Sequence, residues 1–361
     1  MGLLAASRHD VGQRPNASVR ENLVTVAFGG WLVLGLFTDG WAHLNLPALE
    51  TFFTPWHGML YSGFAGGALW LVVLARRRHR LGWPWLRALP VGYPLAAVGV
   101  LAFGAGGVGD MLWHLALGVE TGIDALLSPT HLILLVGGSL VLTSALRAGW
   151  ARPPDPAGPS LHGELPAVLS LVLVTALAAF FLLYVSVFTG AAAADGLTRI
   201  PEGAPGHEAA ELPAVTGLAA YLITTVLLVV PVLLAQHTRR RPPGMIVLLV
   251  AVVAWLSAAV GGFSVSTALA AAAATVGAAV AEPIVARIDR SGLTVAVRSA
   301  AVAATVPAVI WPAQLLALAV TDGVGWPIEL WSGVVLLSVL VAATLGVVTG
   351  WSTDAVSSTT P

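Results

Sequence analysis

The segment Leu23–His43, LVTVAFGGWLVLGLFTDGWAH, decides the fold class of this chain. It is apolar over most of its length, and near its end Asp39 and His43 stand four positions apart. About 20 mostly apolar residues are enough for a helix that crosses the hydrocarbon core of a bilayer. The segment therefore predicts a membrane helix that carries two ionisable groups close to one end.

The composition of the whole chain extends this prediction. Hydrophobic residues make up 57% of the 361 residues and charged residues only 10%, a balance that excludes an ordinary soluble domain. The net charge of −1 indicates no nucleic-acid partner, and the chain has no cysteine for disulfides or thiolate metal sites. We expect an all-α, polytopic membrane protein whose main partner is membrane lipid.

Apolar runs between charged or Pro/Gly-rich breaks predict a bundle of about ten transmembrane helices. The predicted ranges are 23–43, 54–75, 90–115, 128–147, 165–189, 213–236, 244–262, 265–286, 294–320 and 328–351. The stretch GGFSVS at 261–266 allows either a tight turn or a kink in a longer helix. Three regions follow: a tail at 1–22, a four-helix region at 23–150, and a bundle of about six helices at 151–361.

The arginines predict the orientation in the membrane. All seventeen basic residues are arginine, and with ten helices all of them except Arg199 fall on the same side. Basic loops favour the cytoplasmic side. We therefore expect a multi-pass protein of the plasma or inner membrane, with both termini in the cytoplasm and the tail at 1–22 cytoplasmic.

Two predicted outer hairpins share one pattern. The first reads DGWAHLNLPALETFFTPWHGMLYSG over residues 39–63, and the second reads DMLWHLALGVETGIDALLSPTHLILLVG over residues 110–137. Each contains an Asp and a His four positions apart, then an acidic residue, a Ser/Thr-Pro step and a second His. We interpret this as an internal duplication of a two-helix unit in the N-terminal half, as in parallel membrane repeats.

The spacing predicts that each hairpin gathers one Asp and two His at the outer face. Residues i and i+4 share a helix face, and a Ser/Thr-Pro step is typical of an N-cap followed by Pro in the first turn. The second His then lies in the first turn of the next helix. The predicted metal ligands are Asp39, His43 and His57 in one hairpin and Asp110, His114 and His131 in the other, with Glu50 and Asp124 as supporting residues.

Two His and one carboxylate suit copper, zinc or non-haem iron, with coordination positions left open. The alternative is a structural polar network without metal. Such a network accounts for a repeated Ser/Thr-Pro cap, but it does not account for the repeated Asp, His and His, since ionisable groups in a membrane are costly unless paired.

These residues resemble the integral-membrane C subunit of the copper membrane monooxygenases, the particulate methane and ammonia monooxygenases. That family carries a D-x3-H step with a further His about a dozen residues on, and a second triad with Asn in place of Asp. Here the second triad keeps Asp110, and thirteen and sixteen residues separate the last two His of the two triads. The resemblance implies copper, with zinc or iron as alternatives.

Three functions remain open from the sequence. The preferred one is a copper-binding membrane oxidoreductase, or a subunit of one that works with partner subunits or as a homo-oligomer. The second is a metal uptake or handling protein, which the scarcity of charged groups in the later helices disfavours. The third is a zinc-dependent membrane hydrolase, which the lack of an H-x3-H pair disfavours. No catalytic residue is assigned.

Overall fold

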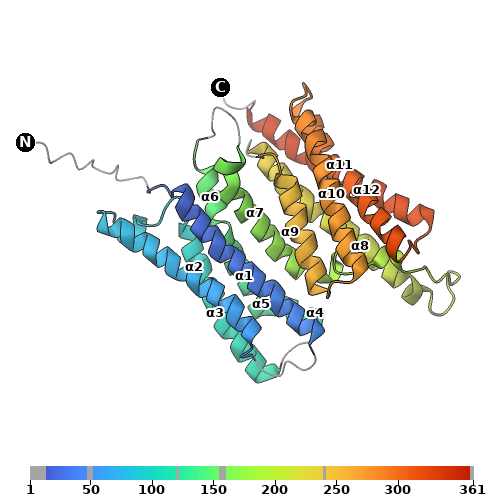
Figure 1. The fold of residues 1–361 in the computed structure, drawn as a ribbon, viewed down its shortest axis with the longest axis horizontal. Helices are drawn as coiled ribbons and strands as arrows, with labels where there is room; N and C mark the ends of the chain where they lie inside the picture. Colours follow the sequence, from blue (N-terminus) through green and yellow to red (C-terminus); the bar gives the residue numbers. More distant parts are fainter. Residues whose placement is uncertain (1–13, 47–51, 119–121, 154–159, 239–240, 358–361) are drawn as a thin grey trace, which may run out of the picture.

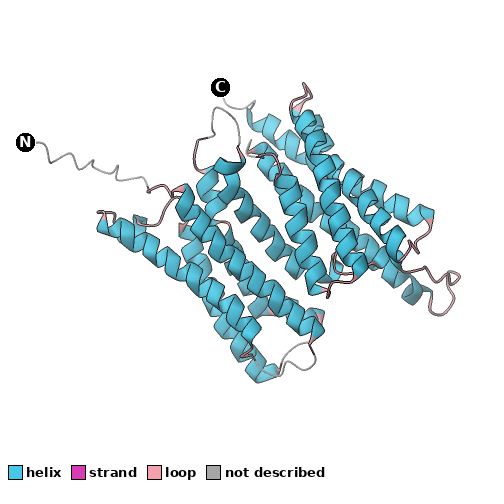
Figure 2. Ribbon diagram, in the orientation of Figure 1, coloured by secondary structure: helices cyan, strands magenta, loops and turns pink. Residues whose placement is uncertain are grey.

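The computed structural model describes residues 14–46, 52–118, 122–153, 160–238 and 241–357, and all regular elements in these ranges are helices (Figures 1 and 2). The N-terminal half contains α1 (Val19–Asn45), α2 (Pro55–Arg80), α3 (Pro94–Leu117), α4 (Ile123–Leu127), α5 (Pro129–Leu142), α6 (Ser144–Trp150) and α7 (Leu161–Phe181). The C-terminal half contains α8 (His207–His237), α9 (Met245–Val260), α10 (Val265–Asp289), α11 (Val295–Thr321) and α12 (Ile328–Ser357). Short 3-10 turns occupy 85–87, 183–185 and 192–194.

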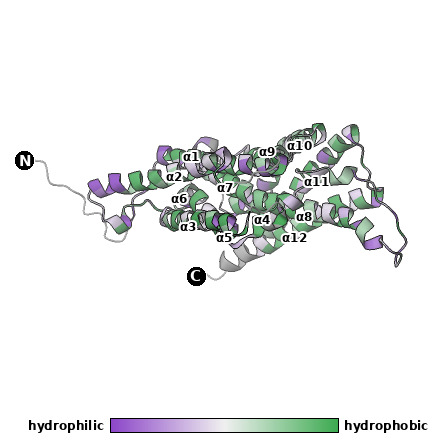
Figure 3. Cartoon of the chain, turned by 90° about the horizontal axis from the view of Figure 1, so that it is seen from below, coloured by the Kyte–Doolittle hydropathy of each residue, from purple (hydrophilic) through white to green (hydrophobic). Residues whose placement is uncertain are grey.

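The predicted membrane-helix architecture is confirmed. Nine helices within the described ranges, with α5 and α6 taken as one, are long and apolar enough to span a membrane, and α9 is a shorter apolar helix. Figure 3 shows apolar residues along the helices and hydrophilic ones gathered toward some of the helix ends and connecting loops. The division into a four-helix region and a C-terminal bundle stays a prediction.

Helix starts follow the expected capping chemistry. Ser18 and Glu21 form a capping box at the start of α1. Thr54 caps α2 and Ser128 caps α5, each followed by Pro in the first turn, and each hydroxyl accepts a hydrogen bond from the backbone N–H three residues on. The reading of both Ser/Thr-Pro steps as helix starts is therefore correct.

Several helix boundaries differ from the predictions. Helix α7 ends at Phe181 instead of near 189, because side chains satisfy the backbone beyond it: the Thr189 hydroxyl donates to Leu183 O, and Thr224 accepts from the Val187 N–H. Helix α8 starts at His207, earlier than 213. The first four residues of the GGFSVS stretch form a turn between α9 and α10, and α10 begins at Val265. In this turn Phe263 takes a positive φ of 50°.

The predicted helix at 128–147 is broken at Thr143 into α5 and α6. Ser170 of α7 lies in this break: its hydroxyl donates to the carbonyl of Leu142 and accepts from the N–H of Leu146, 3.1 Å away. Arg147 caps the same region through its guanidinium, which donates to Leu140 O at 2.8 Å. A side chain from a neighbouring helix thus replaces part of the backbone ladder.

Glycines bring α1 against α2 and α3 against α5. A Cβ on Gly35 would lie 2.6 Å from Leu60 Cα, and one on Gly63 would lie 2.6 Å from Leu32 N. Such contacts require glycine, because a methyl group at either position would meet backbone atoms.

The second hairpin makes the corresponding contacts. A Cβ on Gly106 would lie 3.2 Å from Leu134 Cγ, and one on Gly137 would lie 2.6 Å from Phe103 N. Gly106 lies four residues before Asp110, just as Gly35 lies four residues before Asp39. Gly137 lies six residues after His131, just as Gly63 lies six residues after His57.

The bundle places α1, α2, α3 and α5 on one flank and α8, α10, α11 and α12 on the other, with α7 and α9 between them (Figure 1). The start of α1 and the end of α12 lie at the same end of the bundle. At the start of α1, Arg78 pairs with Glu21 at 2.8 Å and its guanidinium donates to Asn16 O. The cytoplasmic position of this end of the bundle stays a prediction.

Candidate metal centre

The first triad assembles at the end of α1 and the start of α2, away from the arginine-rich end. One turn of α1 separates Asp39 from His43, and the Asp39 Oδ2 to His43 Nε2 distance is 3.7 Å. His57, in the first turn of α2, places its Nδ1 3.5 Å from Asp39 Oδ1. One nitrogen or oxygen atom from each residue lies within 4.8 Å of the others.

The second triad repeats this arrangement on α3 and α5. Asp110 Oδ2 lies 3.5 Å from His114 Nε2, and Asp110 Oδ1 lies 3.4 Å from His131 Nδ1. The ligand-type atoms of the three residues again lie within 4.8 Å of one another. All six residues predicted from the sequence are therefore brought together in the two predicted groups.

The residues that cap the helices also orient the second His of each triad. Thr54 Oγ1 lies 3.1 Å from His57 Nδ1, and Ser128 Oγ lies 2.7 Å from His131 Nδ1. In both rings this Nδ1 is also the nitrogen that faces the Asp, so the hydroxyl and the carboxylate lie against the same ring atom and together fix the orientation of the ring. On α3, the carbonyl of Gly118 lies 3.3 Å from His114 Nδ1, while Nε2 of the same ring faces Asp110. Support on the nitrogen opposite the ligand atom is the usual arrangement around a metal-binding His.

The donor sets fit a metal ion. Ligand atoms about 2.1 Å from a tetrahedral metal lie roughly 3.4 Å from one another, close to the Asp–His distances on α1 and α3. Asp39 and Asp110 are buried, with 8% and 1% of their surface exposed. Asp39 Oδ1 has no hydrogen-bond partner among the described residues. A buried carboxylate oxygen without such a partner is costly, and a cation would remove that cost.

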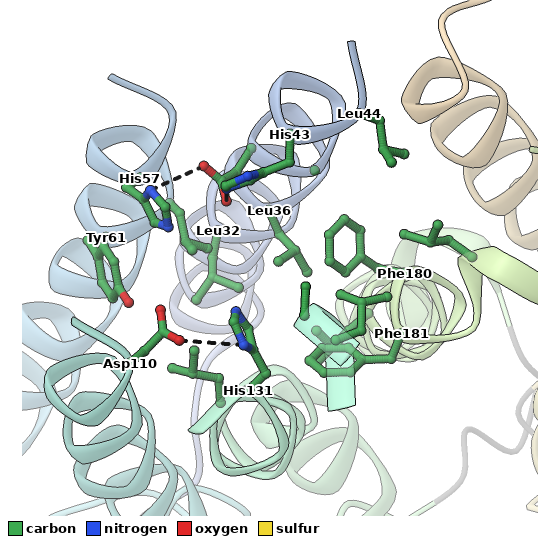
Figure 4. A pocket seen from close by; sticks show the side chains of 18 of the residues that line it. Leu32, Leu36, His43, Leu44, His57, Tyr61, Asp110, His131, Phe180 and Phe181 are labelled. Carbon is green, nitrogen blue, oxygen red and sulfur yellow. Dashed lines mark ion pairs between the residues drawn. The ribbon is translucent and has the colours of Figure 1, made fainter. Parts of the chain in front are cut away.

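Both triads line one pocket (Figure 4). The remaining walls are mainly apolar and come from α1, α2, α3, α4, α5 and α7, including Leu36, Leu60, Phe103, Leu134 and Phe180. The two sites therefore share one cavity, a point that the spacing of the hairpins did not decide.

Sequence reasoning missed several residues of this site. Tyr61 lies one helical turn after His57, so the i+4 rule could have identified it. Thr130 donates a hydrogen bond to Asp110 Oδ1 at 3.2 Å. Phe52 stacks on His57 at a ring distance of 4.7 Å and also lies near His114, at 6.2 Å. Phe180 of α7 reaches the pocket from a distant part of the chain, and no local pattern indicates it.

The two supporting carboxylates predicted from the sequence are Glu50 and Asp124. Glu50 lies outside the described residues, and Asp124 belongs to the short helix α4, which the sequence did not predict. Their proposed roles stay predictions.

Comparisons with known proteins identify no relative: no family model, no curated protein and no solved structure matches this chain. The fold and the site together define a membrane-embedded helical protein with two clusters of metal-ligating side chains. The similarity to the copper monooxygenase C subunit rests on these triads alone.

Proposed function

We propose that the chain is an integral-membrane copper-binding protein that holds one ion in each triad. The observation that carries this proposal is the repeated arrangement of a buried Asp between two His, each with a hydroxyl on the second His. A structural network needs no such repeated set of one Asp and two His.

Copper is preferred for chemical reasons. The sites contain imidazole and carboxylate without thiolate, a donor set that admits copper, zinc and iron, and the affinity order of divalent metals favours copper over zinc. The resemblance of the triads to the copper monooxygenase C subunit supports the same choice. An internal duplication is part of the proposal, and the matching glycine contacts of the two hairpins support it.

The apolar surroundings of the two triads favour an oxidoreductase, or a subunit of one, over a transporter. Both triads open onto a largely apolar pocket, which suits a small substrate or dioxygen and not a hydrated ion path. Within the described residues of helices α8, α9, α10, α11 and α12 themselves, no charged residue is buried, although a relay for ions would need such groups. Arg241, whose side chain is 6% exposed, lies between α8 and α9 and pairs with Glu282 of α10. We place the pocket at the outer face of the plasma or inner membrane, from the arginine distribution.

Metal analysis tests the proposal. The purified protein is loaded with copper, freed of excess ion, and its metal content is measured by mass spectrometry. We expect close to two copper ions per chain, each with the nitrogen-rich electron paramagnetic resonance signal of Cu(II)–imidazole ligation. Protein that retains no copper, or that retains copper without this signal, would contradict the proposal and favour a structural polar network.

A further inference from the structure

Tyr61 connects the two triads. Its ring stacks on His57, with ring centres 6.2 Å apart and planes inclined by 15°. Figure 4 shows its hydroxyl directed toward Asp110. Tyr61 therefore belongs to the helix that carries His57, and its hydroxyl is directed toward the carboxylate of Asp110 in the other triad.

A glycine on α3 makes this position possible. A Cβ on Gly107 would lie 2.8 Å from Tyr61 Cε1 and 3.0 Å from its hydroxyl oxygen. Any larger residue at position 107 would push the phenol away. The ring thus lies directly against the helix that carries Asp110 and His114.

The hydroxyl is buried and has no hydrogen-bond partner among the described residues. A buried hydroxyl without a partner costs free energy, and a phenylalanine would fill the same space without that cost. The corresponding residue of the second hairpin, four positions after His131, is Leu135. A phenol is therefore present on only one side of an otherwise repeated site.

We propose that the pocket binds a small anion or oxygen-donor ligand, held between the metal of the Asp110 triad and the Tyr61 hydroxyl. A metal held by Asp110, His114 and His131 would accept an electron pair from the ligand, and the Tyr61 hydroxyl would donate a hydrogen bond to the same ligand. This inference rests on the proposed function and gives it a ligand class. Tyr61 is in this role a ligand-binding residue and does not coordinate the metal.

Azide titration of the copper-loaded protein tests this inference. Azide is a small anion, and its binding to Cu(II) is followed by the ligand-to-metal absorption band. We expect Tyr61→Phe to weaken azide binding about tenfold, since hydrogen bonds to charged groups contribute about 1.5 kcal/mol or more. The copper content of the Tyr61→Phe variant should stay at the wild-type value. Tyr93→Phe, which removes a phenol hydroxyl that bonds Asn22 at the other end of the helices and does not line the pocket, is the matched control and should leave azide binding unchanged.

Combining Tyr61→Phe with the loss of a ligand from either triad shows which triad binds the azide. In His43→Ala, which removes a ligand of the first triad, Tyr61→Phe should still weaken azide binding. In His114→Ala, which removes a ligand of the second, Tyr61→Phe should have no further effect. Gly107→Ala should imitate Tyr61→Phe by displacing the phenol.

The outcomes separate the two proposals. Equal azide affinity in wild type and Tyr61→Phe, with two copper ions in each, overturns this inference and leaves the proposed function standing. Loss of copper in Tyr61→Phe overturns it as well, because Tyr61 would then support the metal and not the ligand. Wild-type protein without copper overturns both.

Discussion

Asp39 and His57 belong to different helices, yet Asp39 Oδ1 and His57 Nδ1 lie 3.5 Å apart. Asp110 and His131 repeat this relationship at 3.4 Å. In each case the preceding Ser or Thr fixes where the second helix begins, and close glycine contacts fix how near that helix comes to the first. The two hairpins thus reach the same geometry through the same kinds of residues.

Replacing one His in either triad should remove one metal ion per chain. We expect His43→Ala and His114→Ala each to lower bound copper from about two ions per chain to about one, because a triad with one ligand missing loses most of its affinity. Mass spectrometry of the loaded proteins measures the content. His79→Ala is the matched control, since His79 stacks on Trp85 far from the pocket. Undiminished copper in both triad variants would contradict the assignment of the ligands.

The cap hydroxyls should support metal binding beyond their role as caps. Ser128→Ala should weaken copper binding at the second triad by about 10–100-fold, the usual effect of removing a group that orients a ligand, and Ser128→Thr should restore it. Competition with a copper chelator measures the affinity. Ser264→Ala removes an equivalent cap from α10, a helix that contains no His, and should leave the affinity unchanged. A loss in Ser264→Ala as large as that in Ser128→Ala would show that capping alone explains the effect.

The carboxylate at position 50 should have a smaller effect than a ligand. We predict that Glu50→Gln weakens copper binding by about 10–100-fold at most, less than His43→Ala does, because the amide keeps the size of the side chain and loses only its charge. The same chelator competition compares the two variants. Equal losses in Glu50→Gln and His43→Ala would instead make Glu50 a ligand.

The orientation can be tested with single cysteines, since the chain has none. Leu86, 88% exposed, lies in the arginine-rich segment between α2 and α3. We expect a membrane-impermeant thiol reagent to leave Leu86→Cys unlabelled in intact cells and to label it after lysis, because arginine-rich loops stay in the cytoplasm. Glu202→Cys, exposed in the loop before α8, is the positive control. Labelling of Leu86→Cys before lysis would reverse the topology.

The break between α5 and α6 should depend on Ser170. Its removal leaves the carbonyl of Leu142 and the N–H of Leu146 without their buried partner. We expect Ser170→Ala to lower the free energy of unfolding by about 1–3 kcal/mol and to lower Tm in detergent, with copper content unchanged. Thr344→Ala, which removes an exposed hydroxyl bonded within its own helix, is the control. An equal Tm for both variants would contradict this role.

The amino-acid sequence alone determined the membrane-helix fold and the composition of both triads. Apolar runs long enough to span a bilayer, the i+4 spacing of Asp39 and His43, and the Thr54 cap are local features, and their consequences follow from helix geometry. Because each triad is built within one hairpin, short-range spacing was sufficient to find it. Tyr61 follows from the same spacing but was missed.

Only the tertiary structure decided that the two triads share one pocket. That pocket requires α3 to lie beside α2 so that Gly107 admits Tyr61, and it requires α7 to close the apolar wall with Phe180. The break at Thr143 likewise depends on Ser170, which comes from another helix. Contacts between helices of an apolar bundle depend on the close packing of side chains that are distant in the chain, and a local pattern contains no information about which helices become neighbours.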